Sequence, residues 1–144
     1  MCSSDLLNHA HSLSGEYLLT LMTTPITNQT PVSIILPVLN EERYLEATVA
    51  AITSQDYEGE LEIILALGPS RDRTNEVAAR LLKSNSRIKL VENPSGRTAD
   101  ALNTAIAQST FPIIVRVDGH SILPAGYIRE AVATLVRKIG RAHV

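Results

Sequence analysis

The tripeptide Asp118-Gly119-His120 has the residue types and spacing to bind a metal ion, with a carboxylate and an imidazole on either side of a flexible glycine. This pair suits Mg²⁺ or Mn²⁺, with diphosphate oxygens and water completing the coordination. An Asp-Gly turn is also common in loops, where His120 would cap a helix or point to solvent. The tripeptide therefore indicates a metal site only in combination with other residues.

Other polar positions have the chemistry to bind a phosphorylated ligand. Arg97 lies at the predicted start of a helix, where a guanidinium and free backbone N–H groups favour a phosphate, although a solvated arginine fits the pattern equally well. Pro37 ends an apolar run and leaves the following backbone open to a ligand. Asn40 and Glu41 fit the cap and first turn of a helix. None of these residues is diagnostic alone.

Four repeats of an apolar, β-rich run followed by a turn and a helical pattern position these residues. This order predicts an α/β fold, a Rossmann-like parallel sheet flanked by helices. The predicted strands cover residues 32–37, 61–67, 88–91 and 111–117. A helix is predicted to follow each strand. The first has Asn40 as its N-cap and the second begins near Asp72. The third has Thr98 as its N-cap, and the fourth has Pro124 near its first position. Their expected buried faces include Leu45, Val49 and Ile52; Val77, Ala78, Leu81 and Leu82; Leu102, Ala105 and Ile106; and Ile128, Val132, Leu135 and Val136.

Parallel strands joined by right-handed crossovers place their strand-to-helix loops at one edge of the sheet. Ligands of open α/β sheets bind at that edge, beyond the carboxyl ends of the strands. The loops that hold Asn40, Gly68, Arg97 and Asp118 are therefore expected to converge. Their convergence predicts one binding site.

Composition excludes several function classes. The 144 residues, 44% of them hydrophobic, fit one globular domain. Thirteen basic against 15 acidic residues give no broad cationic surface for nucleic acid. No apolar run approaches the roughly 18 residues that span a bilayer. The sequence also lacks the glycine-rich dinucleotide and P-loop motifs and the nucleophile elbow of α/β hydrolases.

Three segments taken together resemble the family 2 glycosyltransferases. They are Val-Ser-Ile-Ile-Leu-Pro-Val-Leu-Asn-Glu-Glu at 32–42, Gly-Arg-Thr-Ala-Asp-Ala-Leu-Asn at 96–103 and Val-Arg-Val-Asp-Gly-His at 115–120. Their order and spacing match the family throughout residues 32–136. The segment Leu-Gly-Pro-Ser-Arg-Asp-Arg-Thr at 67–74 is similar to bacterial enzymes related to succinoglycan-type exopolysaccharide synthesis.

The resemblance implies a GT-A fold and transfer of a sugar from a nucleotide-diphosphate sugar to a hydroxyl of a glycan or lipid-linked acceptor. It places Pro37, Asn40 and Glu41 in the nucleotide pocket. Asp118, and Arg97 from its place at a helix start, are further predicted donor-binding residues. Asp118 and His120 stand where the family carries its Asp-x-Asp metal motif, so a divalent metal, Mg²⁺ or Mn²⁺, is implied.

The sequence departs from the family pattern in three respects, one of which is that the acceptor-binding half and catalytic carboxylate expected of the family have no counterpart in it. Histidine in place of the final aspartate of the metal motif removes one negative charge, which leaves metal preference open. Leu67 and Gly68 occupy the place where many members carry acidic residues that contact the base or ribose, so Gly68 is a substrate-binding position whose nucleobase preference is open.

Two other functions remain as alternatives. A nucleotidyltransferase also binds nucleotides and Mg²⁺ on a Rossmann-like sheet, but its first loop usually carries glycines and a basic residue, whereas residues 37–42 are acidic and without glycine. A non-catalytic nucleotide-binding module is the second alternative.

The ends of the chain are expected to lie outside the domain. Residues 1–30 are predicted as a disordered or non-native arm with the natural start at Met22, residues 31–138 as a truncated GT-A-type domain, and residues 139–144 as a non-native tail, since both ends resemble translated sequencing-adapter DNA. The catalytic base is expected downstream of Lys138. No lysine or arginine precedes Arg43, so secretion is not expected. A cytoplasmic location is predicted, with contact to the cytoplasmic face of the inner membrane only through downstream regions.

Overall fold

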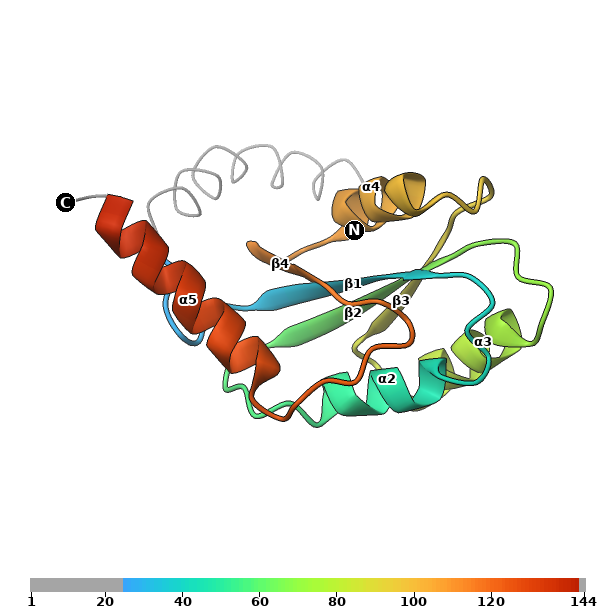
Figure 1. Cartoon of the computed structure of the whole chain (residues 1–144), viewed down its shortest axis with the longest axis horizontal. Coiled ribbons are helices and arrows are strands. Elements are labelled where there is room, and N and C mark those ends of the chain that lie inside the picture. Colours follow the sequence, from blue (N-terminus) through green and yellow to red (C-terminus); the bar gives the residue numbers. More distant parts are fainter. Residues whose placement is uncertain (1–24, 143–144) are drawn as a thin grey trace, which may run out of the picture.

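The computed structural model describes residues 25–142, which form a four-stranded parallel sheet flanked by helices (Figure 1). The strands are β1 (Val32–Val38), β2 (Leu61–Leu67), β3 (Ile88–Glu92) and β4 (Ile113–Arg116), in the order β3-β2-β1-β4. All three strand pairs are parallel. The α/β fold class predicted from the sequence is confirmed.

Within residues 25–142, four helices cover the two faces of the sheet (Figure 1). They are α2 (Leu45–Thr53), α3 (Thr74–Ser84), α4 (Thr98–Gln108) and α5 (Tyr127–Ala142). The larger core joins one face of β1 and β2 to α2, α3 and α5, and it includes Ile34, Leu36, Ile63, Leu65, Leu45, Ile52, Val77, Ile128 and Val132. The smaller core joins the other face to α4 through Ile35, Ile64, Ala66, Ala101 and Ala105. Because both faces are covered, β1 and β2 are predominantly apolar, with Ser33 and Glu62 as their buried polar residues.

Three helix starts differ from the sequence expectations, one of them being that of α5, which begins at Tyr127, three residues after Pro124. α2 begins at Leu45 rather than at Asn40, because Asn40 adopts a left-handed conformation with φ of 55° and does not cap the helix. Asparagine is one of the few residues that tolerate this region. Thr98 is the first residue of α4 rather than its cap, and the N-cap residue Arg97 makes no side-chain capping hydrogen bond.

Other differences concern the buried helix faces and β4. Leu82 and Ile106 are exposed. On α4 the buried residues are Ala101 and Ala105, so the helix presents small side chains to the sheet. Strand β4 is shorter than expected, since the N–H of Phe111 donates to the Ser33 hydroxyl (3.1 Å) ahead of the strand.

The expected domain boundaries meet the described residues at both ends. Residues 1–24, including Met22, and residues 143–144 lie outside the described part. Residues 25–30 differ from the predicted loose arm, because Ile26 packs against the larger core and the Tyr57 hydroxyl donates to the Thr30 carbonyl. The boundary expected at Lys138 falls inside α5.

Within residues 25–142, none of the helices combines the length and the apolar character needed to cross a bilayer.

Candidate functional site

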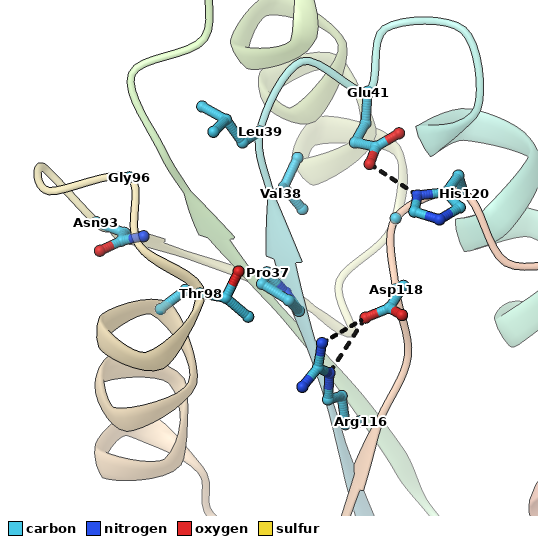
Figure 2. A pocket seen from close by; sticks show the side chains of 12 residues that line it. Pro37, Val38, Leu39, Glu41, Asn93, Gly96, Thr98, Arg116, Asp118 and His120 are labelled. Atoms are coloured by element: carbon cyan, nitrogen blue, oxygen red, sulfur yellow. Dashed lines mark hydrogen bonds and ion pairs between the residues drawn. The ribbon is translucent and has the colours of Figure 1, made fainter.

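A pocket of about 270 Å³ opens at the carboxyl ends of β1 and β4 (Figure 2). β2 lies on one side of β1 and β4 on the other, so this is the point at which the strand order reverses. Open α/β sheets bind their ligands at such points. The pocket is lined by Pro37, Val38, Leu39, Glu41, Asn93, Gly96, Thr98, Ala101, Arg116, Asp118, Gly119 and His120.

The register of the sheet aims the polar side chains into this pocket. Arg116 pairs with Ile35, which lies on the face of the sheet that α4 covers. Side chains alternate along a strand, so Arg116 and Asp118 lie on that same face. Ile114, on this face as well, is 40% exposed, because α4 leaves this part of β4 uncovered. The space between α4 and β4 is the pocket.

Asp118 is paired with Arg116. The guanidinium donates from Nε (3.1 Å) and Nη2 (3.0 Å) to the same carboxylate oxygen, Oδ1. The Arg116 and Asp118 side chains are 50% and 47% exposed. Both charges therefore remain in contact with solvent.

His120 is paired with Glu41 from the loop that follows β1. Nδ1 of His120 lies 2.9 Å from Oε1 of Glu41. This hydrogen bond, followed by the charge of Glu41 and more weakly that of Asp118, raises the pKa of His120 above its usual value. When the imidazole is neutral and its Nδ1–H donates to Glu41, its Nε2 lone pair is available to a ligand.

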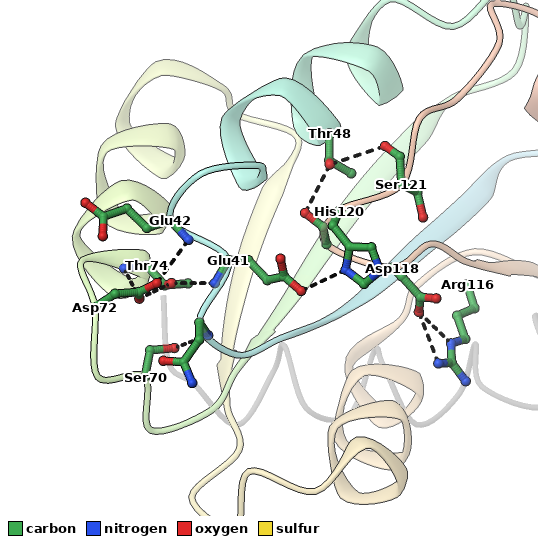
Figure 3. A network of polar contacts seen from close by, with 12 residues as sticks. Glu41, Glu42, Thr48, Ser70, Asp72, Thr74, Arg116, Asp118, His120 and Ser121 are labelled. Atoms are coloured by element: carbon green, nitrogen blue, oxygen red, sulfur yellow. Dashed lines mark hydrogen bonds and ion pairs between the residues drawn. The ribbon is translucent and has the colours of Figure 1, made fainter.

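The loop that carries Glu41 is tied to the segment between β2 and α3 (Figure 3). Three consecutive backbone N–H groups, those of residues 40, 41 and 42, donate to side-chain oxygens of Ser70 (3.0 Å), Thr74 (2.8 Å) and Asp72 (3.3 Å). In return, the Asn40 Oδ1 accepts from the N–H of residue 71 (2.8 Å). The segment 67–74 thereby fixes the loop from which Glu41 enters the pocket.

The turn that carries Asp118 and His120 is held by α2. The buried Thr48 hydroxyl lies 3.1 Å from the Gly119 carbonyl and 3.4 Å from that of Ser121. A Cβ atom at Gly119 would lie 3.0 Å from Glu41 Cγ. Glycine therefore lets this turn approach Glu41 closely.

The family described as "Glycosyl transferase family 2" matches residues 33–138. The chain belongs to this family. The match includes β2, β3 and β4, all of β1 except Val32, and the loops that line the pocket.

Individual members of glycosyl transferase family 2 and related structures cover most of this chain. "Succinoglycan biosynthesis protein ExoA" of Rhizobium meliloti is 29% identical over 70% of this chain and 32% of the relative. "GalNAc(5)-diNAcBac-PP-undecaprenol beta-1,3-glucosyltransferase" of Campylobacter jejuni is 32% identical over 78% of this chain and 36% of the relative. The mannosyltransferase PcManGT of Pyrobaculum calidifontis, solved with GDP-Man and Mn²⁺, superposes with a TM-score of 0.60 at 26% identity, over 91% of this chain and 39% of that protein. The chain spans about a third of the length of these curated relatives.

The structure brings four of the predicted site residues together: Pro37, Glu41, Asp118 and His120 line one pocket. Three others do not line it. The Asn40 side chain is engaged with the 67–74 segment. A Cβ at Gly68 would lie 2.9 Å from Leu39 Cδ1, so Gly68 is packed beneath that side chain. Arg97 pairs with Asp100 (2.9 Å) in solvent.

Sequence reasoning missed three polar residues that line the pocket. Arg116 lies two residues before Asp118, and the alternation of side chains along a strand was a usable signal for it. Asn93 and Thr98 come from the loop after β3 and the first turn of α4. Their approach depends on the packing of α4, which no local pattern revealed. The binding roles of Asn40, Gly68 and Arg97 stay predictions.

The donor set of the pocket fits a divalent cation that arrives with its nucleotide. Within residues 25–142, no three His, Cys, Asp or Glu side chains gather into a preformed metal centre. Among the residues that line the pocket, Asp118 and His120 supply the carboxylate and the imidazole predicted as metal ligands. Mg²⁺ and Mn²⁺ sites commonly use one or two protein ligands together with substrate phosphates and water. The residues present therefore suit a cation shared with a diphosphate.

Proposed function

We propose that these residues form the donor-binding part of a glycosyltransferase that transfers a sugar from a nucleotide-diphosphate sugar to an acceptor hydroxyl. The observation that carries the proposal is the pocket at the carboxyl ends of β1 and β4, where Pro37, Glu41, Asp118 and His120 converge. Membership of glycosyl transferase family 2 supports this reading over a nucleotidyltransferase or a non-catalytic module.

In the proposed complex, each polar residue of the pocket has a distinct role. Asp118 and His120 hold a divalent cation, Mg²⁺ or Mn²⁺, against the donor diphosphate. Glu41 orients the imidazole through its contact with Nδ1 (2.9 Å). The bound cation would offset the negative charge that develops on the departing nucleoside diphosphate. The mannosyltransferase structure with GDP-Man and Mn²⁺ supports this use of a metal.

The acceptor and the cellular role are proposed from the relatives. The names of the Rhizobium and Campylobacter proteins refer to succinoglycan biosynthesis and to an undecaprenol-linked glycan. We assign this chain to bacterial exopolysaccharide or cell-envelope glycan synthesis, with a glycan or lipid-linked acceptor, at the cytoplasmic face of the inner membrane. Deprotonation of the acceptor hydroxyl is assigned to a carboxylate base outside residues 25–142.

The substitution Asp118→Asn tests the proposed site. It keeps the size of the side chain but removes the charge that a cation requires. We expect the chain to bind UDP-glucose or GDP-mannose in the presence of Mn²⁺, and Asp118→Asn to weaken the tighter of these complexes by about tenfold or more in isothermal titration calorimetry.

Asp56→Asn is the matched control, because Asp56 also pairs with an exposed arginine, Arg129, but lies outside the pocket. Asp56→Asn should bind the nucleotide sugar with the same affinity as the wild type. Equal affinities of Asp118→Asn and wild type for the nucleotide sugar would contradict the proposed metal site. No binding of either nucleotide sugar by the wild type would contradict the donor-binding function.

A further inference from the structure

We propose that Arg116 binds the diphosphate of the donor directly, and that its pairing with Asp118 is the arrangement from which it is released when the donor enters. This inference rests on the proposed donor-binding function and assigns a role to a residue outside the predicted metal pair. It concerns how the pocket accommodates an anion beside two carboxylates.

The charges that line the pocket require a cationic partner for a diphosphate. Glu41 and Asp118 contribute two carboxylates, which repel an anionic ligand. Among the twelve lining residues, Arg116 is the one arginine or lysine. His120 is engaged with Glu41. Arg116 is therefore the side chain that carries a positive charge at every physiological pH and can reach the ligand.

The contact between Arg116 and Asp118 leaves both partners with unused capacity. Nε and Nη2 both donate to Oδ1, so the second carboxylate oxygen is not used by this pair. The guanidinium carries five N–H donors, and two of them serve this contact. The pair is about half exposed, and exposed ion pairs contribute little to stability. Breaking this ion pair so that Arg116 can contact a diphosphate therefore costs little free energy.

The position of Arg116 favours such an exchange. Figure 2 shows its guanidinium between Asp118 and the side of the pocket formed by Pro37 and Thr98. A guanidinium recognises phosphate through two parallel N–H···O bonds, the same geometry that it uses for a carboxylate. When Arg116 turns to the diphosphate, both oxygens of Asp118 become available to a cation. Binding of the donor would then favour binding of the cation, and binding of the cation would favour binding of the donor.

The inference predicts opposite effects of Arg116→Gln on two ligands measured separately. Glutamine keeps hydrogen-bonding groups but removes the charge. We expect UDP or GDP, whichever the wild type binds more tightly, to lose about tenfold or more in affinity in EDTA, followed by NMR titration. Mn²⁺ alone should bind no more weakly, and up to a few-fold more tightly, because the competing guanidinium is absent. Arg116→Lys should recover part of the nucleotide affinity.

The matched control is Arg80→Gln, which breaks the exposed pair with Glu46 (3.2 Å) away from the pocket. It should leave both affinities unchanged. Unchanged nucleotide affinity in Arg116→Gln would overturn the inference, and so would weaker binding of both nucleotide and Mn²⁺, which would mean that Arg116 acts only by supporting Asp118. If the wild type binds nucleotide with Mg²⁺ but not in EDTA, the inference fails and the proposed function stands. Absence of binding under both conditions rejects both.

Discussion

The two edges of the sheet each carry a carboxylate paired with a cationic side chain, but they differ in burial. At the amino edge, the Glu62 side chain is 8% exposed and contacts Lys89 Nζ at 2.8 Å. It also accepts hydrogen bonds from the Ser33 hydroxyl (2.5 Å) and the Thr110 N–H (2.5 Å). At the carboxyl edge, the half-exposed Asp118 carboxylate accepts hydrogen bonds from Arg116 alone among the described residues.

This difference separates a structural carboxylate from one available to a ligand. Glu62 joins β1, β2, β3 and the segment before β4, and its oxygens are occupied by three groups of the chain. Removing it would leave the buried Ser33 hydroxyl and the partly buried Thr110 N–H without this acceptor. The Asp118 side chain is about half exposed to solvent, and its Arg116 pair uses only one of its two oxygens. An ion pair of carboxylate and cation thus stabilises the fold at one edge, and at the other edge it remains accessible to the proposed ligand.

Replacing Glu62 should produce the largest loss of stability. Glu62→Ala removes the partner of the Ser33 hydroxyl and the Thr110 N–H, and we expect the free energy of unfolding to fall by about 3 kcal/mol. Asp118→Asn should change it by less than about 0.5 kcal/mol, because that pair is exposed. Urea denaturation of both variants and wild type measures the contrast. Equal losses in the two variants would remove the distinction between the edges.

The second prediction concerns acid pH and the same glutamate. Burial alone would raise the pKa of Glu62, but hydrogen bonds from Lys89, Ser33 and the Thr110 N–H, with the charge of Lys89, outweigh it and lower the pKa from 4.5 to about 2. A carboxyl group whose pKa is lower in the folded chain than in the unfolded chain stabilises the fold at pH values above its unfolded pKa. That stabilisation is lost as the pH falls from about 4.5 through about 2.

The gap between these pKa values corresponds to roughly 3 kcal/mol of stability that the ionised Glu62 contributes at neutral pH. Wild type should therefore lose more unfolding free energy than Glu62→Gln over this pH range, measured by urea denaturation at several pH values. Asp72 and Asp100, whose pKa values are also lowered by hydrogen bonds, titrate in both proteins and form a common background. Parallel pH profiles would show that Glu62 does not carry the effect.

The sheet could be predicted from the sequence because its determinants are local. Strand β2 has the predicted bounds, and β1 and β3 extend one residue beyond theirs. These strands could be predicted because predominantly apolar runs indicate buried strands. The convergence of Glu41 and Asp118 at one pocket then follows from the handedness of the crossovers.

What could not be predicted depends on contacts between distant segments. Asn40 has the sequence properties of a cap, but its conformation is set by Ser70 and the N–H of residue 71, some thirty residues away. The orientation of α4 is likewise set by Ala101 and Ala105 against the sheet, which leaves Ile106 exposed despite its hydrophobicity. Strand alternation puts Arg116 on the same face as Asp118, but the register of β4 beside β1 shows that this is the face that α4 covers.

The smallest expected effect concerns charge within the site itself. His120 is 62% exposed and its pKa is raised chiefly by the hydrogen bond to Glu41, then by the charge of Glu41, and least by Asp118. NMR titration of the metal-free chain should therefore give an imidazole midpoint above 6.5. Glu41→Gln should lower the midpoint, and Asp118→Asn should lower it by less.

The stability contributed by the His120–Glu41 pair depends on pH in the opposite direction to that contributed by Glu62. A raised histidine pKa means that the charged pair favours the folded chain at low pH, and that this contribution is lost as the pH rises through the folded pKa. At the amino edge, the contribution of Glu62 is lost as the pH falls. A larger shift in Asp118→Asn than in Glu41→Gln would mean that His120 faces Asp118 rather than Glu41 in solution. The imidazole and both carboxylates would then form one cluster, and the site would be more strongly preorganised for a cation than the two separate pairs indicate.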